Sequence, residues 1–189
     1  MKPLERALSN VVNEMANDYT IPETEFIDDI FNPGEKIRNP FHGQDKQDVK
    51  FMFGTKKELD IWIAGTIDKY PLIWLVYPFK ETEDSLNSNL YSYKGVRLIF
   101  AINTTSEKLV QTRLQTTRFV LDQLTDKFTT LLKRSSFTKY VWMDRKVAKS
   151  EEFHPNYSVN QQQTASKVID VWDAIALECD IHLLPKCIK

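Results

Sequence analysis

Cysteine is scarce in this sequence. The 189 residues include two cysteines, Cys179 and Cys187, and three histidines, His42, His154 and His182. A disulfide-stabilised fold has more cysteines in a shorter chain, so both cysteines are expected to be thiols. A structural zinc ion needs about four clustered ligands, which these scattered residues do not provide. The sequence therefore predicts no metal ion and no other cofactor.

Long apolar runs and an excess of charge of one sign are also missing. No run approaches the roughly 20 apolar residues that cross a bilayer, and the first ten residues lack the apolar centre of a signal peptide. The formal net charge is -1, which gives no electrostatic reason to bind nucleic acid or an anionic membrane. We therefore expect a soluble protein from a reducing compartment, with no membrane partner.

Glycine is rare too, and the common catalytic motifs are absent. None of the five glycines lies in a phosphate-binding or dinucleotide-binding pattern, and no serine lies in a Gly-x-Ser-x-Gly frame. His154 and His182 have no evident catalytic partner and are interpreted as polar surface residues. Carboxylates near an apolar strand could hold a metal ion for phosphodiester hydrolysis, but that strand carries no charge, so a solvated acidic surface is preferred. These carboxylates are Asp60, Asp68, Glu81 and Glu83.

Hydrophobic residues, by contrast, make up 42% of the chain and aromatic residues 12%, enough for the core of a single domain. Residues 1–19 are predicted to form an amphipathic helix, because apolar residues recur at steps of three and four. Residues 20–48 keep no period and contain several prolines and glycines, which predicts an irregular arm. This arm either packs on its own domain or wraps around a neighbouring subunit.

The segment after the arm predicts a strand over residues 49–54 and then a helix beginning near Thr55. Thr55 and Glu58 have the spacing of a capping box, in which each side chain satisfies a free amide of the first turn. The buried face of this helix is predicted to consist of Leu59, Trp62, Ile63 and Ile67.

Residues 72–77, "LIWLVY", are apolar without alternation. Such a run predicts a strand that is covered on both faces and lies centrally in a sheet. Residues 79–94 are predicted to form a long polar loop, and loops of about 15 residues in a compact domain are usually functional or disordered. Residues 94–103 are expected to form the next strand, antiparallel to residues 72–77.

A long helix is predicted over about residues 105–134. Thr104 and Glu107 repeat the capping-box spacing, and apolar residues then follow at steps of four and three. The stripe is expected to pack across the sheet, with a coiled-coil partner as the alternative. Its members are Val110, Leu114, Thr117, Leu121, Leu124, Phe128 and Leu131.

The last third predicts a strand over residues 136–144, a polar loop over 145–167 and a final strand. From Ile175 to Leu183 apolar residues alternate with more polar ones, which predicts one buried and one wet face. Trp172 and Asp173 precede this alternation, and Trp172 is interpreted either as core or as an interface anchor. The whole predicts an α+β fold in which a mostly antiparallel sheet of four to five strands is packed by the long helix and N-terminal helices.

This order of elements resembles the tail-terminator or tail-completion proteins of tailed bacteriophages. The resemblance rests on "PLIWLVYP", "VRLIFAINT", the helical segment "LVQTRLQTTRFVLDQLTDKF" and the ending "AIALECDIHL", and it covers about residues 55–185. The ending is also similar to small phage structural proteins associated with Bacteroidetes hosts. In such proteins the last strand lies at the edge of the sheet.

The resemblance implies a non-enzymatic virion protein at the head–tail junction, made in the cytoplasm of a bacterial host. It implies a homo-oligomeric ring, six- or twelvefold, that contacts portal or adaptor proteins and tail proteins and has DNA only as passing cargo. Edge strands and long loops would supply the contacts between subunits, and acidic loop residues in the lumen would repel DNA. The residues expected at the subunit interface or lumen are Phe79, Lys80, Glu81, Glu83, Asp84, Tyr91, Tyr93, Trp172 and Asp173.

Two other classes of protein compete with this expectation. One is a small phage-encoded metal-dependent nuclease, for which the sequence provides no catalytic constellation. The other is a monomeric adaptor or host-interaction protein, which differs from the ring subunit in its oligomeric state.

Overall fold

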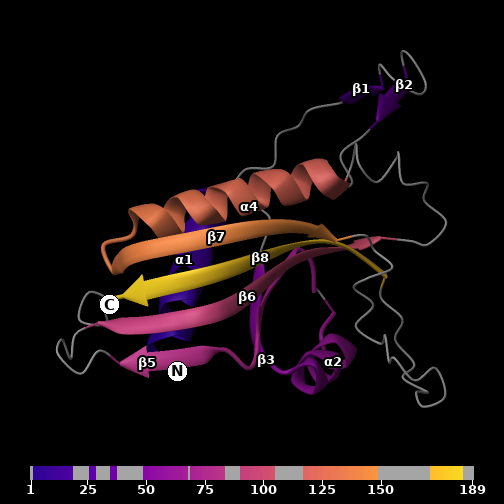
Figure 1. Cartoon of the computed structure of the whole chain (residues 1–189). Coiled ribbons are helices and arrows are strands. Elements are labelled where there is room, and N and C mark those ends of the chain that lie inside the picture. The colour runs from indigo at the N-terminus through magenta and orange to yellow at the C-terminus, as the bar shows by residue number, and fades with distance from the viewer. Residues whose placement is uncertain are drawn as a thin grey trace.

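Figure 1 shows a computed structural model of the chain, built around one curled sheet. The structure describes residues 2–18, 26–28, 35–37, 49–67, 69–83, 90–104, 117–148 and 171–184. Its helices are α1 (Pro3–Asp18), α2 (Lys56–Gly65) and α4 (Thr117–Arg134). Its strands are β1 (Phe26–Asp28), β2 (Glu35–Ile37), β3 (Lys50–Gly54), β4 (Leu72–Val76), β5 (Lys80–Glu83), β6 (Tyr91–Thr104), β7 (Thr138–Ala148) and β8 (Val171–Leu183).

Six strands form the main sheet in the order β3-β4-β6-β8-β7, with β5 pairing to β6 beyond the end of β4. β3 runs parallel to β4, and all other neighbouring strands are antiparallel. This confirms the expected mixed fold on a single sheet, with six strands rather than four or five. The predicted antiparallel pairing of β4 with β6 is also confirmed, since Trp74 lies opposite Ile99.

The apolar run of β4 is buried on both faces, as its sequence predicts. Ile73 and Leu75 belong to one hydrophobic cluster, and Leu72 and Trp74 belong to a second cluster on the other face. Successive side chains of a strand point to opposite faces, so a strand between two cores must be apolar at every position.

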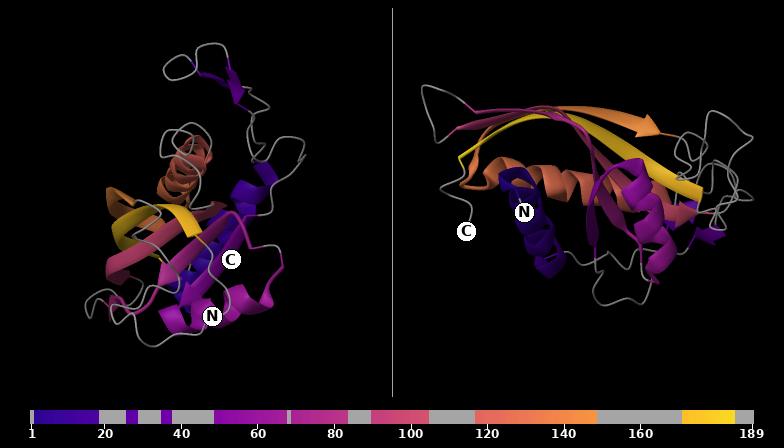
Figure 2. Two further views of the ribbon diagram at one scale, coloured as in Figure 1. Left: turned by 90° about the vertical axis from the view of Figure 1, so that its right-hand side faces the viewer. Right: turned by 90° about the horizontal axis from the view of Figure 1, so that it is seen from below.

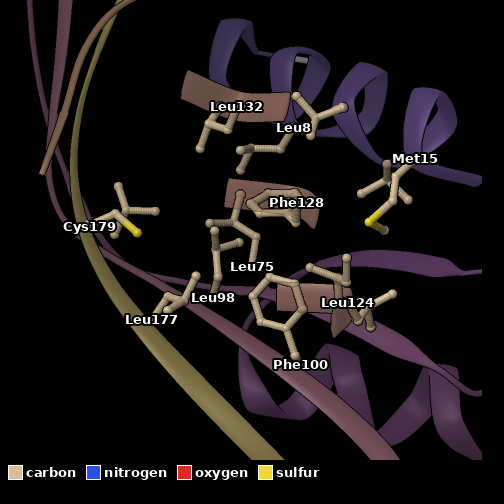
Figure 3. Packing of buried hydrophobic residues seen from close by; sticks show 14 of the residues in the cluster. Leu8, Met15, Leu75, Leu98, Phe100, Leu124, Phe128, Leu132, Leu177 and Cys179 are labelled. Carbon is tan, nitrogen blue, oxygen red and sulfur yellow. The ribbon is translucent and has the colours of Figure 1, made fainter. Parts of the chain in front are cut away.

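The larger cluster fills the hollow of the sheet. Figure 2 shows the sheet curving around α1 and α4, and Figure 3 shows Leu8 of α1 and Phe128 of α4 packed over the strands. Phe128 meets Phe100 of β6 edge to face, with 5.2 Å between the ring centroids. Together, the two amphipathic helices bury their apolar stripes against this face.

The second cluster lies under α2 on the opposite face. Leu59 and Ile63 of α2 pack with Trp74 of β4 and Trp172 of β8. The predicted capping box is present, since the Thr55 side chain accepts a hydrogen bond from the Glu58 amide and the Glu58 carboxylate accepts one from the Thr55 amide.

Several sequence-based boundaries are wrong or unsupported. The single helix over about residues 105–134 is not supported, because α4 has 18 residues from Thr117 to Arg134 and residues 105–116 lie outside the described residues. A stripe at helical spacing shows which face is apolar, and it does not show where a helix begins. Within α4, Leu121, Leu124 and Phe128 are buried as predicted, while Leu132 replaces the half-buried Leu131 in the core.

Two predicted loops and the arm contain strands. β5 and the start of β6 occupy much of residues 79–94, and β7 runs on to Ala148 because it pairs with β8 as far as Ala174. The arm contains β1 and β2, which pair with each other. These strands are polar or very short, so the apolar pattern of the sequence does not reveal them.

The final strand is central rather than an edge. β8 lies between β6 and β7. Its side chains alternate between buried and half-exposed positions from Leu177 to Leu183. Ala174 and Ala176 are buried on the α2 side, so the wet face predicted for β8 begins at Glu178. The strands at the two ends of the sheet order are instead β3 and β7, and β5 also pairs on one side only among the described residues.

Candidate assembly surfaces

Five of the residues predicted to form an interface come together where β5 pairs with β6. The register places Glu81 opposite Tyr93 and Lys80 opposite Lys94. The ring of Phe79 lies 5.9 Å from that of Tyr93, and the Tyr91 ring stacks on Tyr93 at 6.5 Å. The predicted residues in this group are Phe79, Lys80, Glu81, Tyr91 and Tyr93.

Tyr93 joins this end of the sheet to the N-terminal helix. Its side chain is buried, and its hydroxyl donates a hydrogen bond of 3.2 Å to the Glu81 carboxylate. Glu81 in turn pairs with Lys2 at 3.3 Å. Burial, followed by the negative charge of Glu81, raises the pKa of Tyr93 well above its usual range. Tyr93 is therefore a neutral structural donor, because its phenol stays protonated at physiological pH.

Glu5 of α1 is an unusual buried carboxylate near the same group. It is 1% exposed, and its Oε2 atom has no hydrogen-bond partner among the described residues. Its charge makes a smaller contribution to the raised pKa of Tyr93. Burying a carboxylate oxygen without a hydrogen-bond partner costs free energy, so Glu5 lowers the stability of the fold at this end of the molecule.

The acidic residues predicted to face a lumen, Glu81, Glu83 and Asp84, are only partly described. Glu83 ends β5, opposite Tyr91, and Asp84 lies outside the described residues. Lys80 is exposed on the same strand. The prediction of an acidic loop facing a lumen therefore stays a prediction.

Trp172 and Asp173 lie at the other end of the sheet from this group. In the β6–β8 pairing, Trp172 is opposite Asn103, whereas Leu183 is opposite Tyr91. Trp172 is 1% exposed, its indole N–H donates to the Tyr70 hydroxyl, and the two rings meet edge to face. Trp172 therefore fills the core beneath α2 and leaves no surface for a neighbouring subunit.

The carboxylates considered for a nuclease site do not converge. Asp60 lies on α2, which covers one face of the sheet, whereas Glu81 bonds to Tyr93 in the cluster of the opposite face. Asp68 lies outside the described residues. No group of three or more His, Cys, Asp and Glu side chains that could hold a metal ion is found in the part of the chain that the structure describes.

The remaining candidate side chains have structural surroundings. The Ser92 hydroxyl lies 3.3 Å from Nδ1 of His182, on the half-exposed face of β8. Cys179 is buried, and burial raises the pKa of its thiol to about 12, which makes it unreactive at neutral pH. His42, His154 and Cys187 lie outside the described residues.

An exposed apolar segment was missed by sequence reasoning. Within the described chain, the large hydrophobic side chains that are exposed are Phe53 at 40%, Ile61 at 65% and Ile67 at 95%. All three come from residues 53–67, which form β3, α2 and the turn after α2; we call this the β3–α2 segment. Phe53 alternates with Met52, which faces α2, so Phe53 lies on the other face of the sheet from α2. Ile61 and Ile67 are therefore the exposed apolar side chains on the α2 side, and such groups are typical of an interaction surface.

Ile67 was predicted to be buried, and that prediction is wrong. The helix ends at Gly65, and Thr66 has an extended backbone with φ −108° and ψ 133°. Ile67 therefore leaves the helical period that places Leu59 and Ile63 toward the sheet. The sequence shows an apolar residue at position 67, but the direction of its side chain depends on where α2 ends.

The two edges of the sheet lie on opposite sides of the molecule. β3, with five residues, forms the edge beside the β3–α2 segment, and β7, with 11 residues, forms the other edge. In the described chain each of these strands pairs on one side only. An open edge presents unpaired N–H and C=O groups that can pair with another strand.

Comparison with known proteins gives no relative: the chain matches no family model and no curated protein sequence. None of the helices in the described residues is long and apolar enough to cross a membrane.

Proposed function

We propose that this chain is a structural subunit that assembles with copies of itself into a closed ring. The observation that carries this proposal is the placement of the exposed apolar side chains. Ile61 and Ile67 are exposed on and just after α2, Phe53 is exposed on the edge strand β3, and the opposite edge of the sheet is a strand of 11 residues. A cyclic ring needs two different surfaces on each subunit, one for each neighbour, and this arrangement supplies them.

The energetics favour covering the β3–α2 segment. Complete burial of an isoleucine side chain is worth about 1.5–3 kcal/mol, so covering the mostly exposed Ile61 and Ile67 contributes a few kcal/mol to an interface. Association costs at least about 4 kcal/mol in lost translational and rotational freedom. The apolar segment alone therefore roughly offsets that cost, and strand pairing and polar contacts would supply the remainder.

The kind of ring is proposed from the resemblance to tail-terminator proteins. The order of β4, the β5–β6 hairpin, α4 and β8 follows the order on which that resemblance rests. The subunit would lie at the head–tail junction of a virion, as a six- or twelvefold ring between portal or adaptor proteins and tail proteins. DNA would pass through the lumen, with Glu81, Glu83 and Asp84 facing it.

Ring formation is tested by light scattering across a concentration series, with negative-stain images of the larger species. We expect a mass of several subunits and closed rings. Ile61→Glu should lower the association constant of each interface at least about tenfold, which corresponds to a loss of about 1.4 kcal/mol. Ile61 is 65% exposed, so the substitution should leave the fold intact.

The matched control is Thr130→Glu, which adds the same charge to an exposed position of α4. It should assemble like the unchanged chain. A monomer at every concentration would contradict self-assembly, and the β3–α2 segment would then belong to a contact with a different protein, as in the adaptor alternative.

A further inference from the structure

The β1–β2 hairpin is a small sheet of its own. Three residues of each strand pair, from Phe26 with Ile37 to Asp28 with Glu35, and in the described chain neither strand joins the main sheet. Figures 1 and 2 show the hairpin standing away from the helices and the six-stranded sheet. An isolated two-stranded hairpin is marginally stable in water. It therefore needs a further strand to pair with or a surface to pack on.

β7 offers the longest open edge for such a pairing. It spans Thr138–Ala148, pairs with β8 on one side, and ends the sheet on the other. β3 and β5 are less than half as long, with five and four residues. Proteins usually cover or blunt an edge of this length, because its unpaired backbone groups otherwise attract other chains.

The charges of the two segments are complementary. Residues 20–48, which include the hairpin, carry seven acidic and three basic residues, whereas β7 carries three basic residues and one acidic residue. Opposite charges favour an encounter between two surfaces and disfavour contacts of like with like. In residues 20–48 the acidic residues are Glu23, Glu25, Asp28, Asp29, Glu35, Asp45 and Asp48, and the basic residues are Lys36, Arg38 and Lys46. In β7 the acidic residue is Asp144, and the basic residues are Lys139, Arg145 and Lys146.

We infer that the β1–β2 hairpin of one copy adds to the open edge of β7 in a second copy and extends its sheet. This inference rests on the proposed self-assembly and names the contact that joins neighbours. The hairpin is tethered by residues 19–25 and 38–48, and the shorter tether can span at most about 25 Å. A tether of this length lets the hairpin reach a second copy that is in direct contact with the first. Backbone hydrogen bonds would provide the affinity, and the charges would select β7 over other edges.

Disulfide trapping between two differently tagged full-length chains tests the inference. Both chains carry Cys187→Ser, and the buried Cys179 is kept. One chain carries a cysteine in the hairpin, as Ile27→Cys or Lys36→Cys. The other carries Lys139→Cys, Asp144→Cys or Lys146→Cys in β7, or the control Lys133→Cys at an exposed position of α4. A disulfide requires Cα atoms within about 7 Å, so only adjacent strands are trapped.

We expect crosslinks between the hairpin cysteines and at least one β7 cysteine, and none with Lys133→Cys. Crosslinks of β7 to β7 alone would overturn the inference, because copies would then meet edge to edge. A third chain carries both the hairpin cysteine and the β7 cysteine. If crosslinks form only within this chain and never between the two tagged chains, the inference is overturned, since the hairpin would cover its own β7. Rings that form without any hairpin crosslink would reject this contact and leave the proposed function standing. A chain that stays monomeric would reject both.

Discussion

The partial burial of Asp60 opposes its charged form. Its Oδ1 atom is buried and has no hydrogen-bond partner in the described part of the chain. Burial raises the pKa of Asp60 above its ordinary value of 3.8, and the charge of Lys56 opposes this to a smaller extent. The folded chain therefore binds the Asp60 proton more tightly than the unfolded chain. The free energy of unfolding falls as the pH rises from about 3.8 through the raised pKa.

Asp60→Asn should therefore stabilise the protein at neutral pH, because the amide removes the buried charge and keeps the size of the side chain. We expect a small rise of the Tm at pH 7, below the roughly 2–4 °C that about 1 kcal/mol gives in a chain of this length, because solvent screens this partly exposed carboxyl. The gain should shrink as the pH falls toward 3.8, because a growing share of the unchanged Asp60 is then protonated. Thermal melting at both pH values measures this, with Glu14→Gln on the exposed face of α1 as the control. A lower Tm at pH 7 would contradict the prediction.

At the scale of elements, β6 contains a bulge that keeps its core side chains aligned. Tyr93 and Val96 are both buried on the same face although they are three residues apart, an odd spacing that a regular strand places on opposite faces. The pairing with β8 shifts between these two residues. Gly95 has a φ of 64°, and its amide donates a hydrogen bond of 2.9 Å to the Asp180 carboxylate. The bulge therefore depends on a left-handed glycine held by β8.

Gly95→Ala should lower the free energy of unfolding by about 1–2 kcal/mol, because a residue with a Cβ pays that amount in the left-handed region. A Cβ at Gly95 would meet no atom within 4 Å, so the cost comes from the backbone alone. Gly65→Ala is the matched control, since a Cβ there also meets nothing and Gly65 ends α2 without a positive φ. Urea unfolding of both variants measures the difference. Equal stabilities would contradict the role of the bulge.

The same elements show how far the sequence predicts this structure. β4, α2 and the buried face of β8 were predicted because their buried side chains are apolar and recur at the spacing of a strand or helix, which is visible in the sequence. β5 could not be predicted, because Lys80, Glu81 and Thr82 are polar on both faces and become a strand by pairing with β6. The β6 bulge was hidden for a related reason: an odd spacing of apolar residues matches no regular period.

The candidate assembly surfaces were predictable only in part. Phe79, Glu81, Tyr91 and Tyr93 were expected near an interface, and the structure brings them together, yet Tyr93 proves to be buried within the chain. Ile67 was expected in the core and is exposed, because the place where α2 ends is decided by backbone geometry. Which edge of the sheet is open depends on the order of strands, and that order is a property of the tertiary fold.

At the scale of the whole molecule, two hydrophobic clusters share one sheet. Ile73 and Leu75 of β4 face α1 and α4, while Leu72 and Trp74 of the same strand face α2. Loss of packing on one face therefore removes support from strands that also form the other face. We expect both clusters to unfold in a single transition, as in most small domains.

Phe128→Leu tests this coupling. Phe128 packs in the cluster with α1 and α4, whereas Trp62, Trp74 and Trp172 lie in or against the cluster under α2. The substitution should cost about 1–2 kcal/mol through lost packing. The variant and its parent chain both carry Trp142→Phe, so that the fluorescence comes from these three tryptophans. In urea unfolding followed by tryptophan fluorescence and by far-UV circular dichroism, both midpoints should coincide and move down together. A fluorescence midpoint that stays in place while the circular dichroism midpoint falls would mean that the two clusters unfold independently.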